Sequence, residues 1–212
     1  TRITNKSLLG AVLHYQPIPQ VASIKPRRET KDLGIRFIPA MNDIVRVGLI
    51  GAGDFAQSAL LPLIKKNRAL KLNAIVDLDI HNALRISKYY EAKKAYAQED
   101  ELFLDNLIDV VVISTPHSFH CEQAIKALEH GKAVFLETPI VTDFAQLKKV
   151  QTFVEKNPNA PLCVDYNRTF SPFIQKIKKV VQQRSMPLMM QYRVNTNFIE
   201  RDHWIQSSVG AG

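Results

Sequence analysis

Closely spaced glycines in this 212-residue chain have the spacing of a phosphate-binding turn. The segment 51–56 reads GAGDFA and fits the pattern G-x-G-x-x-G/A. Its first glycine permits a tight turn, its second lets backbone N–H groups approach a pyrophosphate, and its final alanine keeps helix and strand close. The N-terminus of a following helix adds unpaired donors and a positive dipole end. We therefore expect the following residues to bind a dinucleotide: Gly51, Ala52, Gly53, Asp54, Phe55 and Ala56.

A carboxylate follows where this motif requires one. Asp77 lies 24 residues after Gly53 and ends the apolar segment 70–76, and an acid at this place accepts hydrogen bonds from ribose hydroxyls. A second acid, Asp79, and the lack of an adjacent arginine in the sequence disfavour a 2′-phosphate. We therefore expect NAD as the cofactor rather than NADP. The alternative is a glycine-rich turn in a sheet protein that binds no dinucleotide.

Alternating strands and helices must position these residues. Apolar and β-branched runs predict strands at 44–50, 70–76, 110–114, 132–136 and 162–165. Helical spacing predicts helices at 54–66, 79–90, 119–130 and 143–156. Gly131 is expected just past the end of one of these helices. Strands that alternate with helices of this length predict an α/β fold, a Rossmann-type doubly wound parallel sheet.

The chain divides into three parts. Residues 1–43 have the composition of an N-terminal arm or linker, and residues 44–165 are predicted to form the dinucleotide-binding Rossmann domain. Beyond them, 173–183 has the pattern of an amphipathic helix and 188–194 that of a strand. Because one strand after one helix cannot bury itself well, we expect residues 166–212 to begin a truncated α+β substrate or oligomerisation domain. The chain starts at Thr1 rather than Met, so we expect a fragment.

Composition excludes several classes of protein. Apolar residues make up 46% of the chain and charged residues 23%, which is ordinary for a globular protein and excludes disordered and fibrous classes. No apolar run approaches the roughly 20 residues of a membrane helix, so we expect no membrane partner. The two cysteines, Cys121 and Cys163, form no C-x-x-C pair and no disulfide framework, which favours a cytoplasmic location. Cys163 is expected to be packed and inert within its strand.

The net charge of +8 raises the question of an acidic partner such as a nucleic acid. The excess charge lies outside the predicted Rossmann domain. Residues 44–165 carry 14 basic and 15 acidic side chains, whereas residues 1–43 carry 7 and 3 and residues 166–212 carry 7 and 2. The basic clusters at 65–66 and 176–179 have helical spacing, so we expect them to lie on solvent-exposed helix faces. We therefore expect no nucleic acid as a partner.

Other residues carry weaker signals for chemistry. His117, His120 and Cys121 fit no common zinc spacing, so we expect no metal site. Asp202 and His203 would form an acid–base pair only on a loop, because adjacent strand residues face opposite sides. His203 is a candidate substrate contact, with an exposed loop as the alternative. Trp204 is expected in a core or an interface.

Three further segments accompany the glycine-rich turn. They are DVVVISTPHSFH at 109–120, GKAVFLETP at 131–139 and YNRTFSP at 166–172. Together with the turn, over about residues 44–204, they resemble the glucose–fructose oxidoreductase / inositol dehydrogenase / MocA family of nicotinamide-dependent sugar oxidoreductases. Segments 54–62 and 202–204 resemble most a bi-domain branch in which a zinc-type alcohol dehydrogenase region precedes this module. Residues 1–43 would then be the tail of that region and a linker.

The resemblance implies roles for particular residues. Thr138 stands where the family usually has the lysine that transfers protons and orients the substrate, and a threonine hydroxyl is a poor general base. Thr138 is therefore the candidate catalytic residue, in a doubtful role, and the family's catalytic histidine is expected beyond Gly212. The resemblance places the following residues beside the cofactor or the domain junction: Thr115, Pro116, His120, Glu137, Pro139, Asn167 and Arg168.

Two functions follow as hypotheses. The first is the dinucleotide-binding module of an oxidoreductase that acts on a sugar or polyol derivative by hydride transfer. The second is a non-catalytic nucleotide-binding module, used for regulation or assembly, that has lost the catalytic lysine. The resemblance favours an enzyme. These 212 residues alone are expected to be inactive. The resemblance also implies a small-molecule substrate and a homo-oligomer formed through the C-terminal domain.

Overall fold

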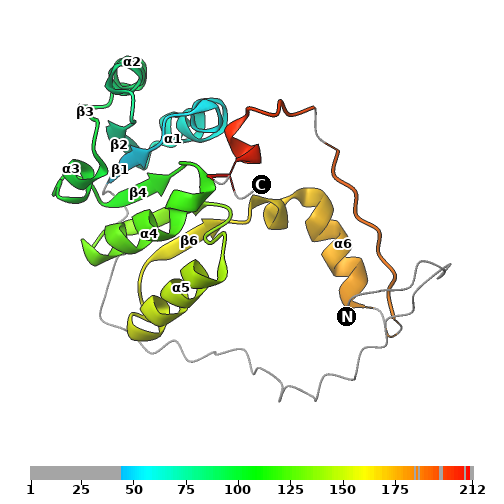
Figure 1. The fold of residues 1–212 in the computed structure, drawn as a ribbon. Helices are drawn as coiled ribbons and strands as arrows, with labels where there is room; N and C mark the ends of the chain where they lie inside the picture. The colour runs from blue at the N-terminus through cyan, green and yellow to red at the C-terminus, as the bar shows by residue number, and fades with distance from the viewer. Residues whose placement is uncertain (1–43, 184, 186, 196–197, 208, 211–212) are drawn as a thin grey trace. The chain divides into compact units, whose positions relative to one another are not determined.

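The computed structural model describes residues 44–183, 185, 187–195, 198–207 and 209–210. All of them belong to one unit, Phe37–Gly212, and the predicted arm, residues 1–43, lies outside the described residues. Strands and helices alternate, and helices cover both faces of one sheet (Figure 1). None of the described helices combines the length and apolar character needed to span a membrane.

The sheet has six parallel strands in the order β3-β2-β1-β4-β5-β6. The strand order reverses between β1 and β4, which is the switch point of a Rossmann-type doubly wound fold. The predicted fold class is therefore confirmed, and each of the five predicted strands is present. The strands are β1 (Val45–Ile50), β2 (Leu70–Val76), β3 (Lys94–Tyr96), β4 (Val110–Ile113), β5 (Ala133–Glu137) and β6 (Leu162–Asp165).

The helices begin with the one that follows the glycine-rich turn. Residues 54–66 are helical as predicted, with a π-helical turn, η1, at Ala56–Leu60. The other helices are α1 (Leu61–Lys66), α2 (Ile80–Tyr90), α3 (Glu99–Phe103), α4 (His120–Glu129), α5 (Phe144–Lys156) and α6 (Pro172–Gln182). Short 3₁₀ turns are η2 (His117–Phe119), η3 (Asn167–Phe170) and η4 (Trp204–Gln206).

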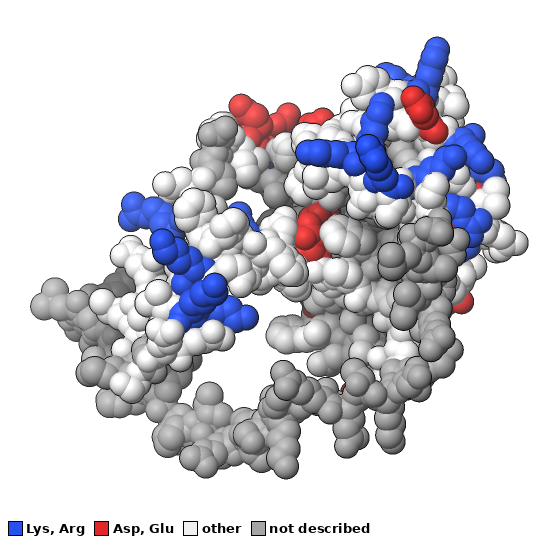
Figure 2. Space-filling view, turned by 180° about the vertical axis from the view of Figure 1, so that it is seen from behind, with Lys and Arg blue, Asp and Glu red and all other residues white. Residues whose placement is uncertain are grey.

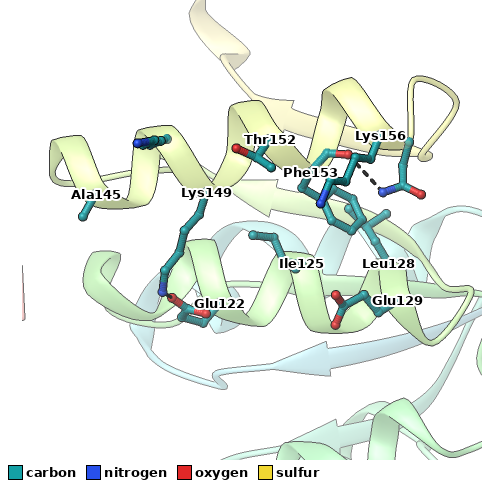
Figure 3. A pocket seen from close by; sticks show the side chains of 11 residues that line it. Glu122, Ile125, Leu128, Glu129, Ala145, Lys149, Thr152, Phe153 and Lys156 are labelled. Atoms are coloured by element: carbon teal, nitrogen blue, oxygen red, sulfur yellow. Dashed lines mark hydrogen bonds and ion pairs between the residues drawn. The ribbon is translucent and has the colours of Figure 1, made fainter.

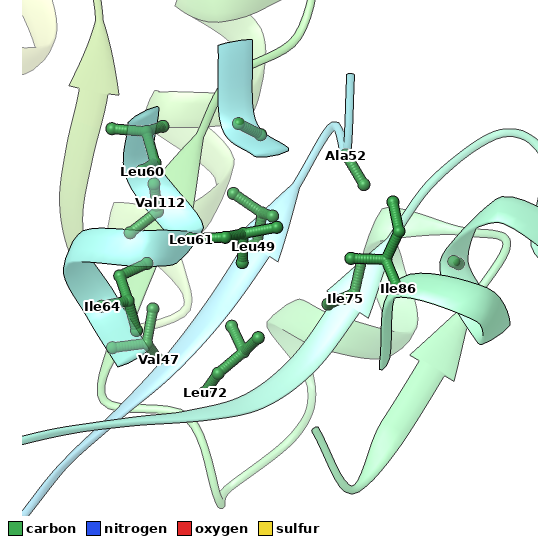
Figure 4. Close-up of a cluster of buried hydrophobic side chains, with 12 residues drawn as sticks. Val47, Leu49, Ala52, Leu60, Leu61, Ile64, Leu72, Ile75, Ile86 and Val112 are labelled. Carbon is green, nitrogen blue, oxygen red and sulfur yellow. The ribbon is translucent and has the colours of Figure 1, made fainter. Parts of the chain in front are cut away.

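Two sets of buried apolar side chains lie on the two faces of the sheet. On one face, side chains of β1, β2 and β4 pack against η1, α1 and α2 (Figure 4). On the other face, side chains of β1, β2, β4 and β5 pack against α3 and α4. Consecutive residues of β1 serve both cores, because Leu49 belongs to the first set and Ile50 to the second. This double cover explains the continuous apolar runs in the strands.

Polar bonds tie the amino ends of the strands together. The backbone N–H and Nε of Arg46 each donate to Oδ2 of Asp109 at 2.8 Å, and its Nη2 lies 2.5 Å from Oδ1. Lys132 is buried, and its Nζ donates to the backbone carbonyls of Asp105 and Ile108 at 2.7 and 3.1 Å. These contacts join β1, β4 and β5 at the edge opposite the glycine-rich turn.

Between α2 and β4 the structure has elements that the sequence patterns do not indicate. β3 has three residues and α3 has five, and both are too short to show a hydrophobic period. Their places are set by tertiary contacts instead. The Leu102 side chain packs where β1 has Gly48, and a Cβ at Gly48 would lie 2.8 Å from its Cδ1.

The prediction of a strand at 188–194 is wrong. These residues form no strand, and none of the described residues pairs with them. A strand needs neighbours to satisfy its backbone groups, so the β-rich composition of this segment is insufficient by itself. The preceding helix is present as α6. The expectation that Cys163 is packed is also wrong, because its side chain is exposed on β6, an edge strand of the sheet.

Candidate functional site

The glycine-rich turn lies at the switch point, between the carboxyl ends of β2 and β4. Gly51 has φ of +85°, and a Cβ there would lie 2.5 Å from the carbonyl oxygen of Ser114. Its N–H donates to Val76 at 2.9 Å, and the Ser114 N–H donates to Ile50 at 2.9 Å. The turn therefore fits closely against both neighbouring strands, and only glycine has the conformational freedom and size that this position requires.

The second glycine of the motif meets a different requirement. A Cβ at Gly53 would have nothing within 4 Å, so the protein itself leaves this space open. Gly53, Asp54 and Phe55 are exposed at the first turn of the helix, and N–H groups in a first turn have no partner within the helix. Ala56, by contrast, is fully buried against the sheet. The arrangement has the open cradle and the close helix–strand contact that a pyrophosphate site needs.

Asp77 links the end of β2 to this turn. Its Oδ2 accepts the backbone N–H of Ala52 at 3.0 Å and the Nδ2 of Asn82 at 3.1 Å. Its Oδ1 accepts the backbone N–H of Asp79 at 3.0 Å. The carboxylate is thus held at the carboxyl edge beside the turn. Asp79 is exposed and caps α2, because its Oδ1 accepts the N–H of His81 at 2.9 Å.

An arginine that sequence proximity does not reveal lies near this acid. Arg85 donates from Nη2 to Oδ1 of Asn82 at 2.8 Å, and Asn82 is bonded to Asp77. Gln57 Nε2 completes the group by donating to the carbonyl oxygen of Ala52 at 2.8 Å. Helical spacing could have indicated that Asn82 and Arg85 lie together, because it places them one turn apart on the same side of α2.

His120 joins the two loops that follow β4 and β5. Its ring is buried, with Nε2 2.8 Å from the carbonyl oxygen of Thr115 and Nδ1 2.7 Å from that of Pro139. Burial lowers the pKa of His120, and the two carbonyls act in the opposite direction. Each ring nitrogen faces a carbonyl oxygen, and the nitrogen that carries the proton donates to it, so His120 positions the loops rather than presenting a free nitrogen. The Thr115 hydroxyl donates to Oε1 of Gln123 at 2.6 Å.

Glu137 and Asp165 end β5 and β6 as register partners. Oε1 of Glu137 is buried and has no hydrogen-bond partner among the described residues. Burial, followed by the neighbouring Asp165, raises the pKa of Glu137 to about 7. Thr138 and Pro139 follow directly and are partly buried. The carboxyl edge of this half of the sheet therefore carries a pair of acids that the sequence motif alone does not bring together.

The remaining predicted contacts lie in η3 and near η4. Asn167 Nδ2 is 3.4 Å from Oδ2 of Asp165, and Arg168 Nη1 is 3.3 Å from the Tyr192 hydroxyl. Both residues are exposed. His203 caps η4 by accepting the N–H of Ile205 on Nδ1 at 3.3 Å. Asn167 thus lies beside the acid pair, whereas the Arg168 side chain donates to the segment after α6.

The segment that includes η4 returns to the loop after β4. The Trp204 and His117 rings meet edge to face with centroids 5.1 Å apart. The Ser118 N–H donates to Val209 at 3.0 Å, and Nδ1 of His117 lies 2.9 Å from the Gly210 carbonyl oxygen. These contacts bring the His203 segment to the carboxyl edge of the sheet. Trp204 is partly exposed and packs on His117 of the same chain, so the expectation that it lies in a core or an interface stays a prediction.

A surface groove elsewhere is distinct from this site. It has a volume of about 900 Å³ and lies between α4 and α5. The Ile125 and Phe153 side chains project into it from the two helices, and Lys149 reaches from α5 to Glu122 of α4 (Figure 3). It is formed by the helix layer, away from the strand ends where doubly wound sheets bind ligands. We therefore locate the functional site at the switch point and not in this groove.

Charge on the surface is mixed. On the face drawn in Figure 2, Lys and Arg side chains lie in several groups, with Asp and Glu side chains among them. Two ion pairs of this kind are described on α4, where Lys126 contacts Asp100 and Glu122 contacts Lys149. This distribution agrees with the near-neutral charge of residues 44–165.

A six-stranded parallel sheet with an open glycine turn and an acid at the switch point defines a dinucleotide-binding Rossmann protein. Residues 45–166 match the Gfo/Idh/MocA oxidoreductase family with an NAD-binding Rossmann fold. The chain belongs to this family, so the resemblance inferred from the sequence is confirmed, as is its classification as an NAD-binding oxidoreductase module.

Curated relatives include dehydrogenases of inositols. The chain is 29% identical over 150 residues to inositol 2-dehydrogenase/D-chiro-inositol 3-dehydrogenase of Shouchella clausii, a match covering 69% of this chain and 43% of that one. It is 22% identical over 142 residues to inositol 2-dehydrogenase of Corynebacterium glutamicum strain R, covering 67% and 42%. The chain thus spans less than half the length of these relatives.

Solved structures of the same fold hold either dinucleotide. Scyllo-inositol dehydrogenase from Lactobacillus casei, with bound NAD(H) and scyllo-inositol, has a TM-score of 0.63 and 25% identity, and the match covers 66% of this chain and 42% of that one. A 3-ketoreductase from Actinomadura kijaniata, in complex with NADP and TDP-benzene, has a TM-score of 0.60 and 22% identity, covering 66% and 43%. The fold therefore accommodates NAD or NADP.

Proposed function

We propose that this chain binds NAD at the carboxyl ends of β1, β2 and β4 and serves hydride transfer to or from a polyol or sugar derivative. The observation that carries the proposal is the bond between Asp77 and the N–H of Ala52. This bond holds an acid beside a turn whose second glycine faces open space. The relatives named as inositol dehydrogenases support a polyol as the substrate class.

The residues present fit a dinucleotide. The first-turn N–H groups at Gly53, Asp54 and Phe55 would hold the pyrophosphate, because they are exposed and aligned at a helix N-terminus. The free lone pairs of the Asp77 carboxylate would accept the ribose hydroxyls. His120 would fix the spacing of the loops at Thr115 and Pro139. When bound, the nicotinamide supplies or accepts the hydride.

The preference for NAD over NADP rests on charge. Asp77 would repel a 2′-phosphate, and Asp79 adds a second negative charge nearby. Arg85 is the counter-argument, but its guanidinium is bonded to Asn82, so a 2′-phosphate would compete with that contact. We propose that NAD is bound more tightly for this reason.

Thr138 defines what this module does in the reaction. Its hydroxyl can donate or accept one hydrogen bond to a substrate oxygen but does not titrate near neutral pH. We propose that it orients the substrate and does not transfer a proton. Glu137, Pro139, Asn167 and Arg168 are proposed to line the same side of the cofactor. His203 is proposed as a substrate contact because its segment reaches the loop after β4.

Further proposals concern the setting of the protein. Two free cysteines support a reducing, cytoplasmic location. A homo-oligomer formed through residues after 166 is proposed from the exposed apolar side chains of α6, such as Phe173 and Val180. An enzyme module is favoured over a purely regulatory one, because the chain belongs to an oxidoreductase family and its relatives include named dehydrogenases.

The test is calorimetric titration of the full chain with NADH, NAD⁺ and NADPH. We expect NADH and NAD⁺ to bind with dissociation constants below 1 mM and NADPH to bind at least about tenfold more weakly, which is about 1.4 kcal/mol. Absence of binding at millimolar NADH and NAD⁺ would overturn the proposed function. Tighter binding of NADPH would support the dinucleotide site but contradict the proposed preference for NAD.

The catalytic part needs a turnover assay with inositols as substrates. The substitution Thr138→Lys places an ammonium group at the position where the family usually has lysine. We expect this substitution to raise turnover in a chain that also carries the family's catalytic histidine. Zero turnover in both the wild type and the variant, with cofactor binding intact, would favour a binding module.

A further inference from the structure

Two carboxyl groups lie side by side where β5 and β6 end. Glu137 and Asp165 are register partners in the parallel β5–β6 pair, and each is the last residue of its strand. Register partners on neighbouring strands project to the same face of the sheet. Within the described chain, the ion pairs include neither carboxylate, so the two acids face one another without a described cationic partner.

One oxygen of this pair is buried and unsatisfied. Oε1 of Glu137 has no hydrogen-bond partner among the described residues, which is unusual because buried polar atoms are nearly always bonded. Two ionised carboxylates on register partners of neighbouring strands would also repel each other. One shared proton removes both difficulties, because the O–H of Glu137 can then donate to the Asp165 carboxylate. The raised pKa of Glu137, about 7, agrees with this reading.

The groups around the pair do not supply a compensating charge. From α4, the buried ring of His120 lies near the Glu137 backbone carbonyl, and burial lowers the pKa of this histidine. From the loop after β5, the Thr138 N–H lowers the pKa of Glu137. From η3, Asn167 is neutral and Arg168 contacts the Tyr192 hydroxyl. Asp165 is therefore the charged neighbour that acts on Glu137.

We propose that the Glu137–Asp165 pair is the proton-exchanging group of the cofactor site. The inference rests on the proposed function, and it assigns to the pair the titration that Thr138 cannot provide. In a doubly wound sheet the second nucleotide lies over the half of the sheet formed by the strands beyond the switch point, here β4, β5 and β6. The pair ends two of these three strands.

The redox state of the dinucleotide determines the proton's position. The oxidised nicotinamide ring carries a positive charge, and a nearby positive charge favours an ionised carboxylate. On binding of NAD⁺, the O–H bond of Glu137 breaks and its proton passes to the buffer, leaving two carboxylates beside one cation. NADH carries no charge on this ring, so the shared proton remains on the pair.

The test measures proton release by calorimetry on the full chain. NAD⁺ and NADH are titrated at pH 6 and pH 8, each in two buffers with different ionisation enthalpies. We expect NAD⁺ to bind about tenfold more weakly at pH 6 than at pH 8, as follows for a group of pKa about 7 that must ionise. At pH 6 the heat of NAD⁺ binding should depend on the buffer, whereas NADH affinity should change less than about twofold.

Matched variants separate Glu137 from other titrating groups. Glu137→Gln keeps a side chain that can donate to Asp165 but cannot titrate, so the pH dependence of NAD⁺ binding should disappear. Asp165→Asn removes the facing charge and should move the midpoint to lower pH. The control is Glu129→Gln, an exposed residue at the end of α4, which should retain the wild-type profile.

A measurement without cofactor tests the pair directly. In ¹³C NMR of glutamate side-chain carboxyls, one signal should titrate near pH 7, and this signal should be absent in Glu137→Gln. A midpoint below about pH 5 for every glutamate would overturn the shared proton. Intact NAD⁺ binding with equal affinity at pH 6 and pH 8 would overturn the inference alone. Failure of NAD⁺ and NADH to bind at either pH would overturn both this inference and the proposed function.

Discussion

Asp77 accepts the backbone N–H of Ala52 at 3.0 Å, so the acid that ends β2 holds the turn that ends β1. The same Oδ2 accepts Nδ2 of Asn82 at 3.1 Å, which joins α2 to the turn. A residue that we propose as a ribose ligand therefore also has a structural role. Substitutions at Asp77 affect both the shape of the turn and its selectivity, and the two effects need separate measurements.

Asp77→Asn should reduce the affinity for NADH about tenfold and weaken the preference over NADPH, because the negative charge that repels a 2′-phosphate is lost. Asparagine can still accept the Ala52 N–H, but its NH₂ group then faces the Asp79 N–H, so one hydrogen bond is lost and the free energy of unfolding should fall by about 1 kcal/mol. Calorimetry with both cofactors and urea unfolding measure the two effects. Asp79→Asn is the control, since asparagine is an equally good helix cap, and a loss of NADH affinity there would contradict the assignment to Asp77.

The two glycines of the motif should respond differently to alanine. Gly51→Ala places a Cβ 2.5 Å from the Ser114 carbonyl oxygen at a φ of +85°. We expect the free energy of unfolding to fall by about 2 kcal/mol or more. Gly53→Ala meets no protein atom within 4 Å, so stability should change by less than about 1 kcal/mol.

NADH binding provides the second half of this comparison. Gly53→Ala should lower the affinity at least about tenfold, because its methyl group would occupy space that the pyrophosphate needs. Wild-type affinity in Gly53→Ala would show that the pyrophosphate lies elsewhere. Urea unfolding and calorimetry on the same protein samples distinguish a folding defect from a binding defect.

His120→Phe should destabilise the loops after β4 and β5. The ring nitrogens lie 2.8 Å from the carbonyl of Thr115 and 2.7 Å from that of Pro139, and phenylalanine would cover these carbonyls without bonding them. An unpaired buried acceptor costs about 1–3 kcal/mol, and a loss of that size should appear in urea unfolding. His81→Phe, at an exposed position on α2, should change stability by less than about 0.5 kcal/mol.

Acid should weaken the bond between Arg46 and Asp109. The Arg46 hydrogen bond holds the pKa of Asp109 below its ordinary value, so the folded state favours the ionised acid. This contribution is present above the unfolded-state pKa of about 3.9 and is lost as the pH falls through the lower folded-state value. The unfolding free energy of the wild type should therefore decline more steeply between pH 5 and pH 2 than that of Asp109→Asn. Parallel curves would contradict this assignment.

Much of the fold could be predicted from local patterns because the sheet is covered on both faces. Continuous apolar runs such as Val110–Ile113 indicated the parallel strands, and the positive φ of Gly131 confirms the predicted helix end. The short elements β3 and α3 could not be found in this way. Their few residues carry no period, and packing such as that of Leu102 against Gly48 places them.

The sequence by itself determined the class of this protein. The GAGDFA turn, the strand before it and Asp77 have a fixed order along the chain, and their chemistry is local enough to be read from spacing. Tertiary structure alone decided which distant groups meet. It brought both ring nitrogens of His120 to backbone carbonyls and Asp165 to Glu137. The physical reason is strand register and helix packing, which align residues far apart in sequence at one edge of the sheet and set their burial.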